Sequence, residues 1–141
     1  MNDDIIIREK VLPEDFYSKS KGYKIRLTWP VPNCAEGCPM NLNCLLEAYA
    51  DSLRHVNQLY NEVFGLELRK VPAHAAHLID IDVVSRMQNT FPHQFDITSS
   101  HKIRSSDDMQ FAFAYNYFLM SELREINSSE IFDRFDIDNS G

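Results

Sequence analysis

Apolar side chains recur at the spacing of an α-helix in three stretches of the chain. These stretches run from Leu53 to Val63, from Ile79 to Phe91 and from Met109 to Glu122. Because residues three or four positions apart lie on one face of a helix, each stretch predicts a helix with a buried face. The third stretch is apolar at most positions, so we expect that helix to be buried on most sides.

Residues at the ends of these stretches support the three helices. Gly65 stands where a left-handed residue would end the first helix. Asp80 and Asp82 suit the positive end of the second helix, which runs up to Pro92. Residues 105–108, Ser-Ser-Asp-Asp, resemble a capping box and predict that the third helix starts directly after them.

Two shorter segments have the pattern of β-strands. Residues 5–7 are three consecutive isoleucines, and residues 24–29 alternate polar with apolar side chains. Residues 29–39 contain three prolines and a glycine, which predict a loop. We therefore place a boundary near Cys38.

Charge changes at the same boundary. Residues 1–38 carry six basic and six acidic side chains, whereas residues 39–141 carry eight basic and fifteen acidic ones. We interpret residues 1–38 as a strand-containing part of one core and residues 39–127 as its helical part. Residues 128–141 form a third segment, which has the pattern of the start of an EF-hand.

Length and composition predict a single globular domain of 141 residues, with 44% apolar and 25% charged residues. The net charge of −7 argues against nucleic acid as a partner. The longest apolar stretch, Phe111 to Met120, is about half the length that spans a bilayer. Three cysteines without a C-x-x-C pair make a structural zinc site a poor interpretation.

The last residues match the first half of a calcium-binding loop that follows a short helix. Asp136, Asp138 and Ser140 occupy loop positions one, three and five, and Gly141 occupies position six. The glutamate of position twelve falls beyond Gly141, so we expect these residues alone to bind calcium poorly. The alternative interpretation is an acidic tail. Asn127 begins an Asn-Ser-Ser sequon and is a candidate site of N-glycosylation.

Three further clusters have side chains that suit phosphate chemistry. The first is Asn2-Asp3-Asp4, in which paired carboxylates can hold a divalent cation or accept a proton. Taken alone, it is more typical of a solvated turn. The others precede predicted helices, where backbone donors favour anions. They comprise His74 and His77, and then His101, Lys102, Arg104, Asp107 and Asp108. An exposed loop histidine and a surface ion pair are the alternative interpretations.

These clusters resemble the conserved segments of one family when they are taken together. Asn2-Asp-Asp4, the Pro-Ala-His segment that ends at His74, and His101-Lys-Ile-Arg104 followed by Asp-Asp-Met-Gln are similar to motifs of the Stealth family of sugar-phosphate transferases. The resemblance covers nearly the whole chain except about residues 39–46. In the family, a catalytic region precedes the Asn-Asp-Asp segment and cysteine-rich repeats follow the Cys38 region, and both are absent here. We expect the isolated chain to be inactive.

The resemblance implies roles for individual residues. Asp3, Asp4, His74 and Arg104 would be catalytic, with one aspartate as metal ligand and the other as candidate base. A second set would bind substrate: Asn2, His77, His101, Lys102, Asp107 and Asp108. The resemblance also implies an α/β fold that forms part of a Rossmann-like nucleotide-sugar transferase core. Within that fold this chain would be helix-rich, with a few strands.

The implied reaction is transfer of N-acetylglucosamine-1-phosphate from UDP-N-acetylglucosamine to mannose 6-hydroxyls of N-glycans on lysosomal enzymes. The implied cofactors are Mg²⁺ or Mn²⁺ with the UDP-sugar, and Ca²⁺ in the EF-hand. The implied partners are high-mannose glycans of lysosomal hydrolases, a gamma subunit and further copies of the chain, at the lumenal side of the Golgi membrane. The alternatives are a non-catalytic calcium-binding module and an accessory fragment of such an enzyme.

Overall fold

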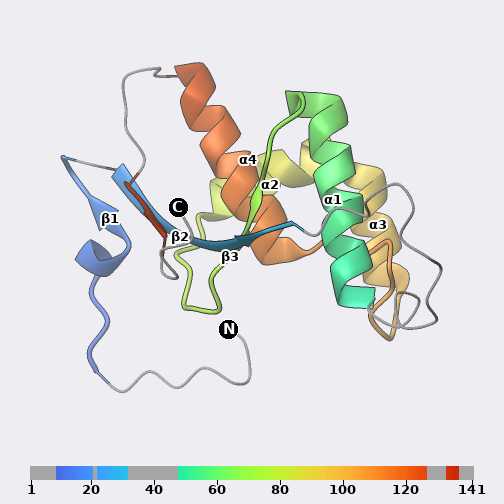
Figure 1. Cartoon of the computed structure of the whole chain (residues 1–141), viewed down its shortest axis with the longest axis horizontal. Helices are drawn as coiled ribbons and strands as arrows, with labels where there is room; N and C mark the ends of the chain where they lie inside the picture. The colour runs from blue at the N-terminus through green and yellow to red at the C-terminus, as the bar shows by residue number, and fades with distance from the viewer. Residues whose placement is uncertain (1–8, 21, 32–47, 127–132, 137–141) are drawn as a thin grey trace.

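The computed structural model describes residues 9–20, 22–31, 48–126 and 133–136 (Figure 1). For residues 123–126 and 133–136 it describes the backbone alone. The predicted strand at residues 5–7 and the boundary near Cys38 lie outside these ranges.

The three predicted helices are confirmed. They are α1 (Ala48–Phe64), α2 (Ile81–Thr90) and α4 (Phe111–Ile126). The structure adds α3 (Pro92–Ser100), which the sequence did not predict. Pro92 suggested only an end to the second helix, but it also suits the first position of a new one, where its missing N–H is not needed. Phe91 is non-helical and separates α2 from α3.

The helix ends follow the sequence signals in two of three cases. Gly65 has a φ of 86°, and its N–H donates to the Asn61 carbonyl at 3.0 Å. The Asp80 carboxylate accepts a hydrogen bond from the Asp82 N–H at 2.9 Å and so caps α2. The start predicted for α4 is wrong by two residues, because residues 105–108 close a separate turn before the helix begins at Phe111.

A four-stranded sheet is built around β2 (Gly22–Pro30), which confirms the strand predicted at residues 24–29. The strands β1 (Tyr17–Ser18) and β3 (Lys70–Pro72) pair with it in antiparallel directions, and β4 (Asp133–Asp136) pairs with it in parallel. A short 3₁₀ helix, Pro13–Asp15, precedes β1. The strand β3 was not predicted because three residues ending in proline carry no strand pattern.

The strand β4 changes the interpretation of the C-terminal segment. The sequence predicted a short helix ahead of a calcium loop, but Asp133–Asp136 form a strand alongside Lys24–Leu27. The helix is therefore wrong for these four residues. Asp138 and Ser140 lie outside the described residues, so the EF-hand itself stays a prediction.

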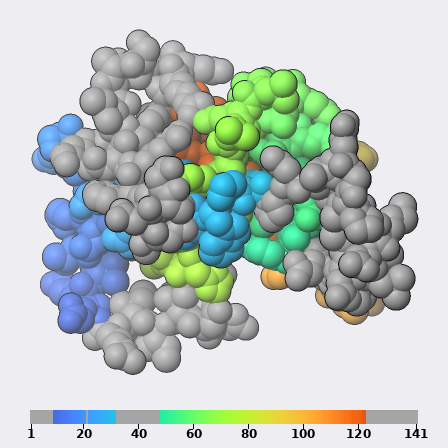
Figure 2. Space-filling view, viewed as in Figure 1, coloured from blue at the N-terminus to red at the C-terminus, as the bar shows by residue number. Residues whose placement is uncertain are grey.

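The core lies between the sheet and the helices, with α4 at its centre (Figure 1). Every residue from Phe113 to Met120 is buried, as expected for a helix that is apolar on most sides. Ile25 and Leu27 of β2 join the same core. Figure 2 shows β2 at the surface of this face, between α1 and β1. Residues from both sides of Cys38 thus build one helix-rich α/β core.

No helix in the described part of the chain is long and apolar enough to cross a membrane.

Candidate functional site

A cleft of about 580 Å³ lies where three parts of the fold meet. The segment between β3 and α2 contributes His74 and His77, and the loop between α3 and α4 contributes Arg104. The first turn of α1 contributes Tyr49. The cleft therefore brings together three residues that the sequence had selected from two separate motifs.

The histidine segment is fixed at the edge of the sheet. Pro72 pairs with Leu27 in the antiparallel register of β2 and β3, and the Ala73 N–H donates to the Arg26 carbonyl at 2.8 Å. Val71 of the same strand is buried. The chain therefore leaves a rigid strand just before it reaches His74 and His77.

The two histidines of this segment differ in exposure. His74 is exposed, whereas His77 is half-buried. Burial lowers the pKa of His77, and this outweighs a hydrogen bond to the Ala73 backbone that acts in the opposite direction. The nearby positive charge of Arg26 also lowers the pKa of His77. His77 is therefore a neutral imidazole near pH 7, able to accept a hydrogen bond or a proton.

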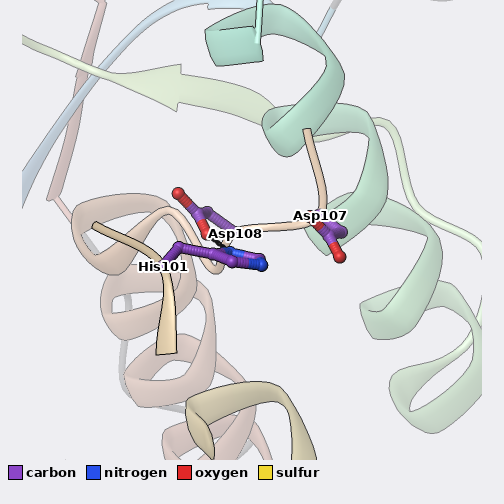
Figure 3. Close-up of side chains that lie close together, drawn as sticks. All are labelled: His101, Asp107 and Asp108. Atoms are coloured by element: carbon purple, nitrogen blue, oxygen red, sulfur yellow. Dashed lines mark hydrogen bonds and ion pairs between the residues drawn. The ribbon is translucent and has the colours of Figure 1, made fainter. Parts of the chain in front are cut away.

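The loop that carries Arg104, residues 101–110, is held by a compact network of side chains (Figure 3). His101 Nδ1 and Asp108 Oδ1 are 2.7 Å apart, and Asp108 Oδ2 accepts from the Ser105 N–H at 2.8 Å. The Ser105 hydroxyl donates to Asp107 Oδ1. At the end of the loop, the Met109 N–H donates to Thr98 Oγ1 of α3 at 2.8 Å.

The charges of His101 and Asp108 stabilise each other. The hydrogen bond to Asp108 raises the pKa of His101. Burial pushes the pKa of Asp108 upward, but hydrogen bonds from His101 and from the Ser105 backbone leave it below its ordinary value. The Ser105 hydroxyl likewise lowers the pKa of Asp107. His101 and Asp108 are therefore an ionised pair at mildly acidic pH.

The same three side chains could face a metal ion, since ligand atoms of His101, Asp107 and Asp108 lie within 4.8 Å of one another. Their hydrogen bonds to each other and to Ser105 account for this arrangement without a cation. We therefore assign them no metal.

The structure separates the predicted site residues into groups. His74, His77 and Arg104 line the cleft. His101, Asp107 and Asp108 hold the loop behind it, and Lys102 is exposed on that loop without lining the cleft. Several predicted residues lie outside the described residues or their described side chains: Asn2, Asp3, Asp4, Asn127, Asp136, Asp138 and Ser140.

Two polar residues that line the cleft were not among the predicted site residues. Tyr49 lies in the first turn of α1, ahead of the apolar series that revealed that helix, so no pattern marked it. Gln110 follows the Asp-Asp-Met segment that was noted, and its position in that motif could have found it. Both residues reach the cleft only because α1 packs against α4.

Comparison with known proteins identifies the family of the segment that carries the predicted cleft residues. Residues 73–121 match Stealth protein CR3, conserved region 3, and this region contains every predicted cleft residue. The chain belongs to the Stealth family. The matched region runs from Ala73 through the Arg104 loop into α4, so the Stealth segment supplies His74, His77 and Arg104 to the cleft.

Three Stealth relatives show how far the likeness extends. The chain is 53% identical over 97 residues to the human N-acetylglucosamine-1-phosphotransferase subunits alpha/beta, and 52% identical to the mouse protein. These alignments cover 69% of this chain but 8% of the relatives. This chain is also 26% identical over 133 residues to the capsular polysaccharide phosphotransferase SacB of Neisseria meningitidis serogroup A. That alignment covers 92% of this chain and 23% of SacB. The chain thus spans less than a quarter of the relatives it matches.

Proposed function

We propose that this chain contributes the phosphate-binding part of the active site of a sugar-phosphate transferase. The observation that carries the proposal is the cleft in which His74, His77 and Arg104 meet within Stealth conserved region 3. The relatives in two distant organisms are both named as phosphotransferases, which supports the reaction class. A guanidinium and two imidazoles that line one cleft suit a diphosphate and an attacking hydroxyl.

The proposed reaction needs three things from the protein. The acceptor hydroxyl oxygen attacks the phosphorus next to the sugar, a new P–O bond forms, the bond to the bridging oxygen breaks, and UMP leaves. Charge on the phosphoryl oxygens must be neutralised, the hydroxyl proton must be accepted and the reactants must be aligned. We assign neutralisation of that charge to Arg104 and acceptance of the hydroxyl proton to His74, with Asp3 or Asp4 as the alternative base. His77 accepts a hydrogen bond and orients the substrate.

The specific substrates that we propose are UDP-N-acetylglucosamine as the donor and the 6-hydroxyl of mannose on lysosomal enzymes as the acceptor. This assignment is supported by 53% identity to a human N-acetylglucosamine-1-phosphotransferase. The same likeness motivates the rest of the proposal: a Golgi-lumenal location, high-mannose glycans and a gamma subunit as partners, and a glycan on Asn127. An accessory, non-catalytic role is the alternative.

The cations belong to the same proposal. Mg²⁺ or Mn²⁺ held by Asp3 or Asp4 would neutralise charge on the donor diphosphate, and Ca²⁺ would bind Asp136, Asp138 and Ser140. Both sets of ligands rest on sequence motifs. The roles assigned above to His74 and Arg104 do not require either residue to bind a cation.

The test is a transfer assay on the purified native protein that contains this sequence, with UDP-N-acetylglucosamine and a mannose glycoside. We expect His74→Ala to lower turnover by about 100-fold or more, since general-base catalysis contributes on that order. Arg104→Lys should weaken donor binding and turnover, because an ammonium cannot reproduce the bidentate fork.

The matched controls are His93→Ala, an exposed histidine on α3, and Arg86→Lys, an exposed arginine paired with Glu122. Both lie outside the cleft and should keep wild-type turnover. Near-normal turnover in His74→Ala and Arg104→Lys would contradict the proposal and favour the accessory role. In a parallel assay UDP-glucose replaces UDP-N-acetylglucosamine. Equal use of both donors would contradict the proposal that UDP-N-acetylglucosamine is the specific donor.

A further inference from the structure

We propose that Tyr49 is a positioning residue for Arg104: its ring holds the guanidinium at the mouth of the cleft and so sets the affinity for a nucleoside diphosphate. The inference rests on the proposed function, because it takes Arg104 as the group that contacts the diphosphate. Tyr49 itself is outside conserved region 3, which begins at residue 73.

The contact between the two side chains is a cation–π interaction. Arg104 Cζ lies 5.6 Å from the centroid of the Tyr49 ring, within the range in which a cation is attracted to an aromatic face. Arg104 is exposed and sits on a loop. In the part of the chain that the structure describes, this ring is the one partner found for its guanidinium. A long side chain without such a partner would sample many rotamers.

The position of the ring is fixed by a hydrogen-bonded link beneath it. Ser52, which is fully buried, donates from Oγ to the Tyr49 carbonyl at 2.8 Å. Ser52 Oγ also accepts from Gln110 Nε2 at 2.7 Å. Gln110 ends the loop that carries Arg104, so the link ties the first turn of α1 to that loop. Ring and guanidinium are therefore placed by two elements that are joined to each other.

This arrangement suits anion binding rather than core stability. The Tyr49 side chain is 40% exposed and both residues line the cleft. A cation–π contact needs no hydrogen-bond acceptor, so the guanidinium can still make a bidentate contact with phosphate oxygens. Because the guanidinium is already ordered, binding a diphosphate costs less conformational entropy.

The test compares Tyr49→Phe, which keeps the aromatic face, with Tyr49→Leu, which removes it. The probe is UDP, and its dissociation constant is measured by calorimetry on the native protein that contains this sequence. Turnover and KM for the UDP-sugar are measured alongside. We expect Tyr49→Phe to bind UDP like the wild type, and Tyr49→Leu to bind it about three- to tenfold more weakly. The KM should rise more than kcat falls, and the melting temperature should stay unchanged.

A double-mutant cycle with Arg104→Ala identifies the route of the effect. In the Arg104→Ala background, Tyr49→Leu should cause no further loss of UDP affinity. An equal loss in both backgrounds would mean that the ring contacts the ligand directly, and would overturn the inference. Wild-type affinity in Tyr49→Leu would also overturn it while leaving the proposed function intact. If Arg104→Ala itself binds UDP normally, the role proposed for Arg104 fails, and the inference fails with it.

Discussion

The His101–Asp108 pair is the individual contact that most directly controls the loop beneath Arg104. Its two members respond to pH in opposite directions. The raised pKa of His101 means that its contribution to stability is present below its unfolded value of about 6.5 and is lost as pH rises through the raised value. The lowered pKa of Asp108 means that its contribution is present above about 3.9 and is lost as pH falls further.

His101→Asn should therefore lower the melting temperature most between about pH 4 and 6.5, where both groups are charged in the wild type. The difference from wild type should shrink as pH rises through the raised pKa of His101. Thermal unfolding followed by circular dichroism across this range measures it. His93→Asn, an exposed change on α3, controls for the loss of a histidine elsewhere. A difference that stays constant at every pH would contradict the ionised pair.

The end of α1 depends on Gly65, a residue with a particular conformational requirement. Its φ of 86° lies in a region that side chains with a Cβ disfavour, and a Cβ placed there would meet no atom within 4 Å. A substitution at Gly65 is therefore unfavourable because of backbone strain, with no steric clash against other atoms. Gly65→Ala should lower the free energy of unfolding by about 1 kcal/mol.

Urea denaturation measures this change, with Gly65→Asn as the matched variant. Asparagine tolerates the left-handed region better than alanine does. Gly65→Asn should therefore lower the free energy of unfolding less than Gly65→Ala. Equal losses for Ala and Asn would show that the backbone conformation is not the cause.

At the scale of the whole molecule, Arg69 links elements that are distant in the sequence. It is a buried cation with 3% exposure. Its guanidinium donates at 3.2 Å to Oδ1 of Asn57, in the middle of α1, and at 3.2 Å to the carbonyl of Gly65, just after that helix. It also lies over the ring of Tyr117 in α4, at 5.7 Å from its centroid. Because Arg69 directly precedes β3, it connects a strand to two helices.

Arg69→Met should lower the free energy of unfolding by about 1.5–3 kcal/mol, the range for hydrogen bonds to charged groups. The control is Arg86→Met, which breaks an exposed pair with Glu122 and should lower the free energy of unfolding much less than Arg69→Met does. Chemical denaturation of both variants provides the comparison. Similar losses in the two would mean that burial of Arg69 contributes nothing.

Local patterns in the sequence were enough for three helices, one strand and the family. Helical spacing, the Gly65 and Asp80 signals and the alternation at residues 24–29 each depend on neighbours along the chain, which is why they could be predicted. The same holds for His74, His77 and Arg104, which belong to short motifs. Their selection required no knowledge of how the motifs meet.

Tertiary structure alone decided what depends on contacts between distant segments. β3 exists because Lys70–Pro72 pairs with β2, and the Tyr117 hydroxyl accepts from the Lys70 N–H at 2.6 Å and donates to its carbonyl at 2.9 Å. β4 replaced an expected helix because pairing with β2 satisfies its backbone. Tyr49 came to lie beside Arg104 because α1 packs against α4 and Ser52 bonds to Gln110. Sequence patterns report the neighbours of a residue along the chain, whereas such contacts are set by which buried surfaces fit together.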